Sequence, residues 1–373
     1  MRVAIVGGGP AGSYLGYCLA RKGIDATIFD DSHPREKPCG GGLTTLGIRK
    51  FPIVHELPSG KVVGKKMMMV SPSGRQAVIE GKEDAWNVSR ASFDGFLLEK
   101  AVSEGAKLVK ERVTDFEKAK DGWKVKTAKG VYDAAILAGA DGVNSMVRSN
   151  LVGPIPKEDL AMCYGCFTEV RREMEELEAI MIFYRDIMGY AWVFPRENDC
   201  SIGVGSELGN ARKAREELQK VVKKYAAGAK IFSWWGAMLP SARTTDFFRL
   251  PTSGKDWILV GDAAGHVNPI TGEGIIYAMW SADLASKAIE SGDIGLYESL
   301  WRKEYGRNLE AGVKSREKFH SSFGIEMSVR LAGRSRTFGR FLYDSINGEV
   351  DYTQFNRSLM KAMPRTLAEF VLP

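Results

Sequence analysis

Glycines at fixed spacing stand near the start of the chain, in the pattern Gly7-x-Gly9-x-x-Gly12. The first glycine permits a sharp turn, the second lets the backbone approach a pyrophosphate, and the third lets a helix lie close to a strand. Asp30 follows about 20 residues later, at the distance where an acidic side chain can bind a ribose hydroxyl. These residue types at this spacing predict a dinucleotide site.

A strand–turn–helix–strand unit is needed to position these residues. Residues 2–6 and 26–29 have the apolar composition of buried strands, and the Ala- and Leu-rich segment that ends at Lys22 is typical of a helix. The N-terminus of that helix would present free N–H groups and a partial positive charge to phosphates. A lone glycine pattern is weak evidence, but the complete unit favours a dinucleotide site over an ordinary glycine turn.

A second glycine-rich stretch carries a thiol. Residues 38–42 read Pro-Cys-Gly-Gly-Gly, and glycine backbone can pass very close to a flat ligand. The thiol of Cys39 would then point into a site. A flexible surface loop is the simpler interpretation, and both interpretations stay open from the local sequence.

Two later segments combine an apolar run with an acidic residue. Residues 134–138 precede Gly-Ala-Asp141-Gly, and residues 257–260 precede Gly-Asp262-Ala-Ala-Gly. An acid at a strand end, followed by small residues that open a helix, is typical of ribose and phosphate binding. We expect that long helix over residues 275–291, whereas the Asp141 segment by itself indicates only an Asp-Gly turn.

Aromatic side chains alternate along residues 190–195. Tyr190, Trp192 and Phe194 therefore share one face of a predicted strand, where they form either core or the floor of an apolar ligand cavity. The nearby Cys163-x-x-Cys166 pair has metal-ligand spacing, but no second pair accompanies it, and residues three apart in a strand face opposite sides. No metal site is predicted.

Composition and net charge limit the classes of protein and of partner that remain. The 373 residues are 44% hydrophobic and 26% charged, which is typical of a globular protein with at least two modules. A net charge of +6 is small for this length, so no nucleic-acid partner is predicted, although an anionic membrane surface or a phosphorylated substrate is compatible with it. Five scattered cysteines argue against a disulfide framework and favour a reducing compartment.

Membrane contact stays open at this stage. No stretch approaches the roughly 20 uninterrupted apolar residues that would span a bilayer, so we expect a cytoplasmic protein that is soluble or peripherally membrane-associated. The C-terminal segment is helical and basic, and its arginines suit either a solvated cap or a membrane-facing surface. These arginines are Arg330, Arg334, Arg336 and Arg340.

Several separated motifs together resemble known flavoproteins. The first 30 residues, GADGVNSMVR at 139–148 and GDAAGHVNPITGEGI at 261–275 resemble the FAD-binding fingerprints of the para-hydroxybenzoate hydroxylase-like superfamily, and Arg90 with Ser-Phe-Asp at 92–94 is similar to that group. Within it, KPCGGG at 37–42 and the Tyr-x-Trp-x-Phe-Pro strand resemble the geranylgeranyl reductase family, which includes archaeal digeranylgeranylglycerophospholipid reductases.

The resemblance implies an α/β fold with a Rossmann-like FAD-binding domain interleaved with an antiparallel β-sheet substrate domain and a helical C-terminal cap. The expected FAD-binding domain is discontinuous, with a hairpin insertion. The expected boundaries are residues 1–155 and 255–295 for the FAD-binding domain, about 60–90 for the hairpin, 156–254 for the β-rich substrate and catalytic domain, and 296–373 for the cap.

The resemblance also assigns roles to residues. Cys39, Tyr190 and Trp192 would be catalytic, and Tyr190, Trp192 and Phe194 would bind the substrate. The residues implied to hold FAD are Gly7, Gly9, Ala11, Gly12, Asp30, Cys39, Gly40, Gly41, Arg90, Asp141, Asp262, Gly272, Gly274 and Ile275.

The implied reaction is saturation of C=C bonds in a geranylgeranyl or polyprenyl chain, carried on a lipid or a diphosphate. A hydride would come from N5 of the reduced flavin, together with a proton. Only one dinucleotide fingerprint is visible, so the electron donor, NAD(P)H or a ferredoxin-like protein, would bind transiently. An FAD-dependent aromatic monooxygenase or halogenase, and an electron-transferring flavoprotein that acts on quinone, stay open as alternatives.

Overall fold

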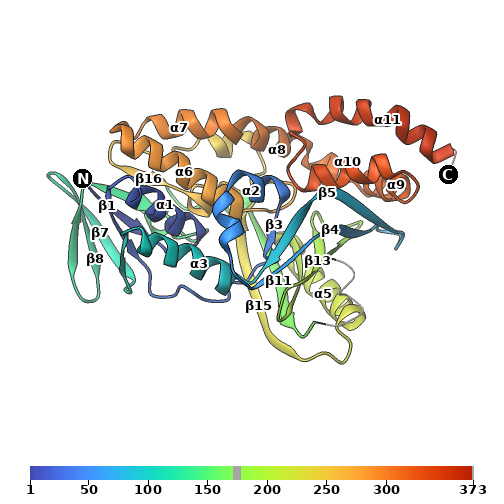
Figure 1. Ribbon diagram of the computed structural model, residues 1–373, viewed down its shortest axis with the longest axis horizontal. Helices are drawn as coiled ribbons and strands as arrows, with labels where there is room; N and C mark the ends of the chain where they lie inside the picture. The colour runs from blue at the N-terminus through green and yellow to red at the C-terminus, as the bar shows by residue number, and fades with distance from the viewer. Residues whose placement is uncertain (171–177, 372–373) are drawn as a thin grey trace.

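The computed structural model describes residues 1–170 and 178–371 (Figure 1). Residues 171–177, within the predicted 156–254 domain, and residues 372–373, at the end of the predicted cap, lie outside the described residues.

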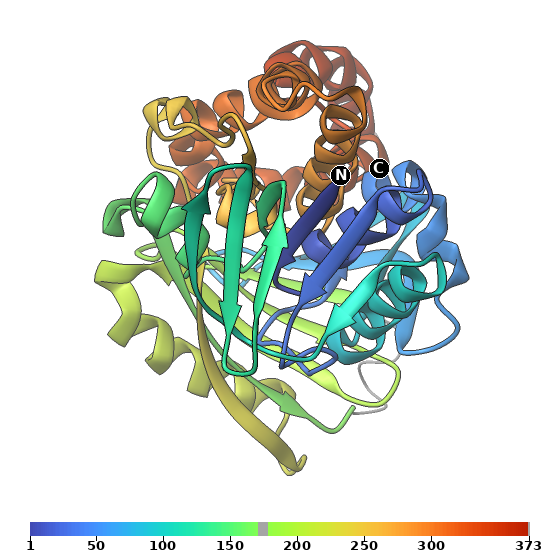
Figure 2. The same ribbon diagram turned by 90° about the vertical axis from the view of Figure 1, so that its left-hand side faces the viewer.

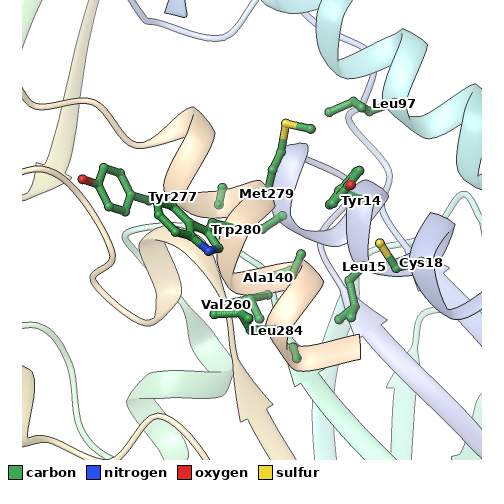
Figure 3. Close-up of a cluster of buried hydrophobic side chains, with 14 of the residues drawn as sticks. Tyr14, Leu15, Cys18, Leu97, Ala140, Val260, Tyr277, Met279, Trp280 and Leu284 are labelled. Atoms are coloured by element: carbon green, nitrogen blue, oxygen red, sulfur yellow. The ribbon is translucent and has the colours of Figure 1, made fainter. Parts of the chain in front are cut away.

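Five strands form a parallel sheet, four from the first 140 residues and one from residues 257–259. In spatial order its strands are β16 (Trp257–Leu259), β10 (Ile136–Gly139), β1 (Arg2–Val6), β2 (Asp25–Phe29) and β6 (Lys107–Val109). Parallel strands of this kind are buried on both faces, which agrees with their continuous apolar runs. Figure 3 shows one covering layer, in which Tyr14 and Leu15 of α1 face Met279 and Leu284 of α6.

Helices cover one face of this sheet and a small meander covers the other. The helices are α1 (Pro10–Ala20), α3 (Arg90–Ser103) and α6 (Ile275–Ser291), and the meander contains β7 (Val113–Ala119), β8 (Gly122–Thr127) and β9 (Val131–Ala134) (Figure 2). Trp123 and Val125 of β8 pack on Ala4 and Phe29 of the sheet. The short helix α4 (Met146–Leu151) follows β10.

A second sheet of eight strands gathers segments from distant parts of the chain. Its spatial order is β15 (Ile231–Pro240), β11 (Leu160–Thr168), β14 (Cys200–Glu207), β13 (Tyr190–Pro195), β12 (Ala179–Phe183), β4 (Lys61–Val70), β5 (Gln76–Val88) and β3 (Gly42–Leu43). Helix α5 (Ala211–Tyr225) packs on one of its faces. Helix α2 (Thr45–Lys50) follows β3.

The C-terminal helices lie along the upper side of the molecule in Figure 1. They are α7 (Leu296–Trp301), α8 (Arg307–Phe319), α9 (Ser322–Ala332), α10 (Arg336–Ile346) and α11 (Phe355–Val371). Helix α7 lies against α6, and α9 and α10 lie on one face of the eight-stranded sheet. Helix α10 packs on β5, and Arg330 and Arg334 lie over the ring of Phe370. Among the described helices, none combines the length and apolar character needed to cross a bilayer.

The predicted α/β class with its Rossmann-like domain is confirmed, as are the helix over 275–291 and the aromatic strand over 190–195. One expectation is corrected, because the second sheet is mixed rather than antiparallel: β12 runs parallel to β4. Strand β4 arrives from the N-terminal part of the chain, so no short hairpin turn forces it to run antiparallel to β12. The domain boundaries stay a prediction.

Candidate functional site

A cavity of about 820 Å³ lies where the carboxyl ends of β1, β2 and β10 meet the eight-stranded sheet. Ligands of open parallel sheets bind at this edge. Of the predicted site residues, all except Gly12 line the cavity. We call the part beside Gly7, Gly9 and Asp30 the nucleotide end.

The glycine pattern at the nucleotide end leaves room for a ligand. A Cβ on Gly12 would lie 1.8 Å from the carbonyl oxygen of Gly7, so this glycine allows α1 to pack against the turn. A Cβ on Gly9, in contrast, would meet no protein atom nearer than 3.7 Å. Gly9 precedes α1, whose first N–H groups face this space. The geometry therefore fits the pyrophosphate of FAD.

Asp30 is held firmly at the end of β2. Its carboxylate accepts hydrogen bonds from the backbone N–H groups of Gly8 (2.6 Å), Ser32 (2.7 Å) and His33 (2.7 Å), and Nδ1 of His33 lies 2.9 Å away. Burial opposes ionisation, but the hydrogen bonds from His33 and Gly8 hold the pKa of Asp30 well below its ordinary value. Asp30 therefore stays an ionised acceptor, and its binding of ribose remains a prediction.

His33 extends this network toward Arg90. Its Nε2 atom lies 3.5 Å from the Asp94 carboxylate, which accepts two hydrogen bonds from Arg90 at 2.8 and 2.7 Å. Burial alone would lower the pKa of Arg90, but Asp94 and the sulfur of Cys39 raise it. Arg90 is thus fixed at the cavity wall, between the nucleotide end and the thiol. Sequence reasoning missed His33, since a lone histidine in a loop carries no pattern.

The stretch around Cys39 is fastened to the aromatic strand and is not a loose surface loop. A Cβ on Gly40 would lie 3.0 Å from the ring of Phe194, so this glycine lets the backbone contact the aromatic floor. The hydroxyl of Ser201 donates to the carbonyl oxygen of Cys39 (3.0 Å) and accepts from Nε1 of Trp192 (3.1 Å). Gly41 has φ of 82°, which favours glycine.

Ionisable side chains that line the cavity with this floor include Cys39, Cys163, Tyr190 and Glu273. Tyr190 donates to the carbonyl oxygen of Thr271. Cys163 faces the cavity whereas Cys166 is buried in the core behind the sheet, as the strand geometry predicted, and no metal-binding group occurs among the described residues.

Glu273 is the side chain that sequence reasoning missed here. It lies between the predicted residues Gly272 and Gly274 and accepts a hydrogen bond of 2.7 Å from the hydroxyl of Thr44. Desolvation raises the pKa of Glu273 to about 7. An acid between two glycines at a helix start was a usable signal, because the backbone there approaches a ligand.

The remaining predicted acids also lie at the cavity wall. The carboxylate of Asp141 accepts from the backbone N–H groups of Met146 (2.7 Å) and Val147 (3.2 Å), so it holds the start of α4. Asp262 lies 3.8 Å from the ammonium group of Lys37. Their contacts with FAD stay predictions.

Comparisons with known proteins agree with this geometry. Residues 1–289 match the family described as "FAD binding domain". A geranylgeranyl diphosphate reductase of Rhodobacter capsulatus is 30% identical, with 85% of this chain and 84% of that protein covered. A digeranylgeranylglycerophospholipid reductase of Methanocaldococcus jannaschii is 26% identical, with 99% of this chain and 97% of that protein covered.

Solved structures show the same fold. A geranylgeranyl bacteriochlorophyll reductase-like protein of Thermoplasma acidophilum has a TM-score of 0.77 at 21% identity, covering 97% of this chain and 99% of that one. A flavin-dependent brominase has a TM-score of 0.74 at 20% identity, again covering 97% and 99%. These two likenesses show the fold alone. The family match and the curated relatives show that the chain binds FAD and belongs to the geranylgeranyl reductase family of FAD-dependent oxidoreductases.

Proposed function

We propose that the protein uses FAD to saturate carbon–carbon double bonds of a polyprenyl chain. The observation that carries the proposal is the packing of the Cys39–Gly42 stretch on Trp192 and Phe194, within the cavity that contains the FAD fingerprint. A chemically reactive side chain and an apolar floor thus lie in one cavity. The names of the relatives point to the same substrate class.

The floor suits an apolar chain with no polar group at its reacting bond. Trp192 stacks on Trp235 at 6.1 Å between ring centroids, and Trp192 and Phe194 lie 6.4 Å apart. Met181 and Met67 also line the cavity. Such side chains bind an isoprenoid by dispersion and by removing it from water. An isolated C=C bond has no carbonyl to take up charge, so exclusion of water also protects the reaction.

Reduced FAD, when bound, supplies the hydride, and the chain itself must supply the proton. We assign the proton donor, or the group that positions it, to Cys39, which lies beside Arg90 and is held by the bond from Ser201. Glu273 is a second candidate, because its pKa of about 7 leaves much of the carboxyl protonated at neutral pH. Tyr190 and Trp192 would orient the chain.

The electron donor would bind transiently, as NAD(P)H or a ferredoxin-like protein, because no second dinucleotide fingerprint is visible in the sequence. Membrane association of the basic C-terminal helices is part of the proposal. A lipid substrate would otherwise have to leave the bilayer unaided.

The test is anaerobic turnover of geranylgeranyl diphosphate by the FAD-loaded protein with dithionite as reductant. We expect products heavier by two hydrogens for each saturated bond, and FAD with long-chain lipid in extracts of the purified protein. A monooxygenase or halogenase would instead form product only with oxygen, and a quinone-directed electron carrier would leave the alkene intact. Either result would contradict the proposal.

A further inference from the structure

Arg316 is a buried cation whose side chain makes no hydrogen bond with any described residue. It lies on α8, is 7% exposed and lines the cavity. Its Nε atom is buried without a partner, and its side chain donates no hydrogen bond within the part of the chain that the structure describes. Burial lowers the pKa of Arg316, and the nearby carboxylates of Glu207 and Asp159 offset this effect only in part. A buried guanidinium whose N–H groups make no hydrogen bonds is unfavourable unless a ligand accepts those bonds.

The carboxylate that pairs with Arg316 also pairs with a second arginine. The Glu207 carboxylate lies 3.7 Å from Nη2 of Arg316, but the same oxygen lies 2.7 Å from Nη2 of Arg243. One carboxylate therefore serves two guanidinium groups. Arg148, a further buried arginine that does not itself line the cavity, has Nε and Nη2 atoms without a partner among the described residues. The Asp159 carboxylate also acts on Arg316 and Arg148, so three guanidinium groups share two carboxylates. The local balance of charge is still positive, which favours an anionic ligand.

Two uncharged polar side chains, His320 and Ser241, line the same cavity as Arg316. His320 lies one helical turn further along, its Nε2 atom 3.2 Å from the carbonyl oxygen of Ile270, while its Nδ1 atom is buried without a partner. Ser241 lines the cavity beyond the end of β15. We call Arg316, His320 and Ser241 the far end.

The far end lies beyond the aromatic floor. Phe194 pairs with Ser201 across β13 and β14, and Ala191 pairs with Val204, so the floor runs from the Cys39 stretch to Tyr190. Glu207, the acid beside Arg316, ends β14 three residues past Val204. An apolar floor with a cation at one end matches a molecule that has a hydrocarbon chain and an anionic head.

We propose that Arg316, with His320 and Ser241 of the same cavity, binds the phosphate or diphosphate group at the end of the polyprenyl substrate. This inference rests on the proposed reduction of polyprenyl chains and adds a residue-level site for the head group. A guanidinium binds phosphate through paired, charge-assisted hydrogen bonds, and this one has its donors free. His320 and Ser241 add polar contacts at the same wall.

The experiment compares geranylgeranyl diphosphate with geranylgeraniol, which has the same chain and no charge, on the FAD-loaded protein. Dissociation constants are measured by quenching of tryptophan fluorescence, since Trp192 and Trp235 line the cavity. Arg316→Gln should weaken binding of the diphosphate by about 10- to 100-fold and leave binding of the alcohol within about threefold. Arg249→Gln is the matched control, because the Arg249 side chain is 77% exposed and pairs with Asp246 at the surface.

Thermal unfolding without ligand separates binding from a structural role. Arg316→Gln removes a buried charge that makes no hydrogen bond with a described residue, so we expect an unchanged or higher Tm. A clearly lower Tm would assign Arg316 to a structural ion pair with Glu207 and overturn the proposal. The FAD midpoint potential should also stay unchanged. A lowered midpoint potential with unaltered diphosphate binding would mean that the charge of Arg316 stabilises the reduced flavin. That result would also overturn the proposal.

The remaining outcomes separate this inference from the proposed function. If wild-type protein binds the alcohol and the diphosphate equally, the head-group site is wrong and the polyprenyl proposal survives. If it binds neither, both are wrong. If inorganic pyrophosphate binds as tightly as geranylgeranyl diphosphate, the site serves a free anion and the assignment to the substrate fails.

Discussion

At the nucleotide end of the cavity, the Asp30 carboxylate accepts three backbone hydrogen bonds. At the far end, the Arg316 guanidinium donates none within the described residues. The nucleotide end is thus shaped by backbone geometry and holds its own acid in place, which suits a cofactor that stays bound. The far end holds a buried guanidinium that shares the Glu207 carboxylate with Arg243, which suits a ligand that arrives and leaves. The two ends therefore differ in how their charged group is held, by three backbone hydrogen bonds at Asp30 and by none within the described residues at Arg316.

The largest effect is expected at the nucleotide end. In Gly12→Ala the new Cβ would lie 1.8 Å from the carbonyl oxygen of Gly7, so α1 must move. We expect loss of bound FAD and destabilisation by about 3 kcal/mol, measured by visible flavin absorbance and thermal unfolding. Gly209→Ala is the control, because a Cβ there meets nothing within 4 Å. If Gly12→Ala kept the FAD content of the wild type, the claim that backbone geometry shapes the nucleotide end would be wrong.

Cys39→Ala tests the role of the thiol that lies between the nucleotide end and the far end of the cavity. Turnover of geranylgeranyl diphosphate should fall by about 100-fold or more if the thiol acts in proton transfer, while FAD content stays unchanged. Cys163→Ala, which also alters a thiol at the cavity wall, should have a much smaller effect. Unchanged turnover in Cys39→Ala would remove the catalytic role and leave the packing of the stretch intact.

Glu273 predicts a pH dependence of stability. Its pKa rises from 4.5 to about 7 on folding, so the folded state binds more protons between these values and stability falls as pH rises through that window. Glu273→Gln should therefore gain stability relative to wild type from pH 4.5 to about pH 7, by at most about 3 kcal/mol. If the stabilities of wild type and Glu273→Gln changed by the same amount across this pH window, the raised pKa of Glu273 would be refuted.

The smallest effect is expected from the bridge between the Cys39 stretch and the floor. Ser201→Ala removes one bond from Trp192 and one to the carbonyl oxygen of Cys39, costing about 1–3 kcal/mol. Turnover should fall a few-fold because the thiol is less well positioned. Ser299→Ala, which removes a hydroxyl bond on an exposed helix surface, is the control for denaturant unfolding. Equal stability of the two variants would mean that the bridge does not fasten the stretch.

The sequence predicted the nucleotide end better than the far end. Gly7, Gly9 and Gly12 act through local backbone geometry, and alternation along one strand places Tyr190 with Trp192, so spacing alone carries the information. Arg316 lies 54 residues beyond Asp262 in sequence and reaches the cavity only because α8 packs there. No spacing rule shows which of many arginines is buried without a hydrogen bond to a described residue. The parallel pairing of β12 with β4 was hidden for the same reason, since it joins distant segments.

The most direct measurement is a single anaerobic turnover. Reduced, FAD-loaded protein is mixed with geranylgeranyl diphosphate while flavin absorbance is followed. The mass of the product is then determined by mass spectrometry. We predict reoxidation of the flavin without oxygen, with one double bond saturated, and thus two hydrogens gained, for each flavin oxidised. Flavin that stays reduced until oxygen is admitted, with the polyprenyl chain unchanged, would contradict polyprenyl reduction.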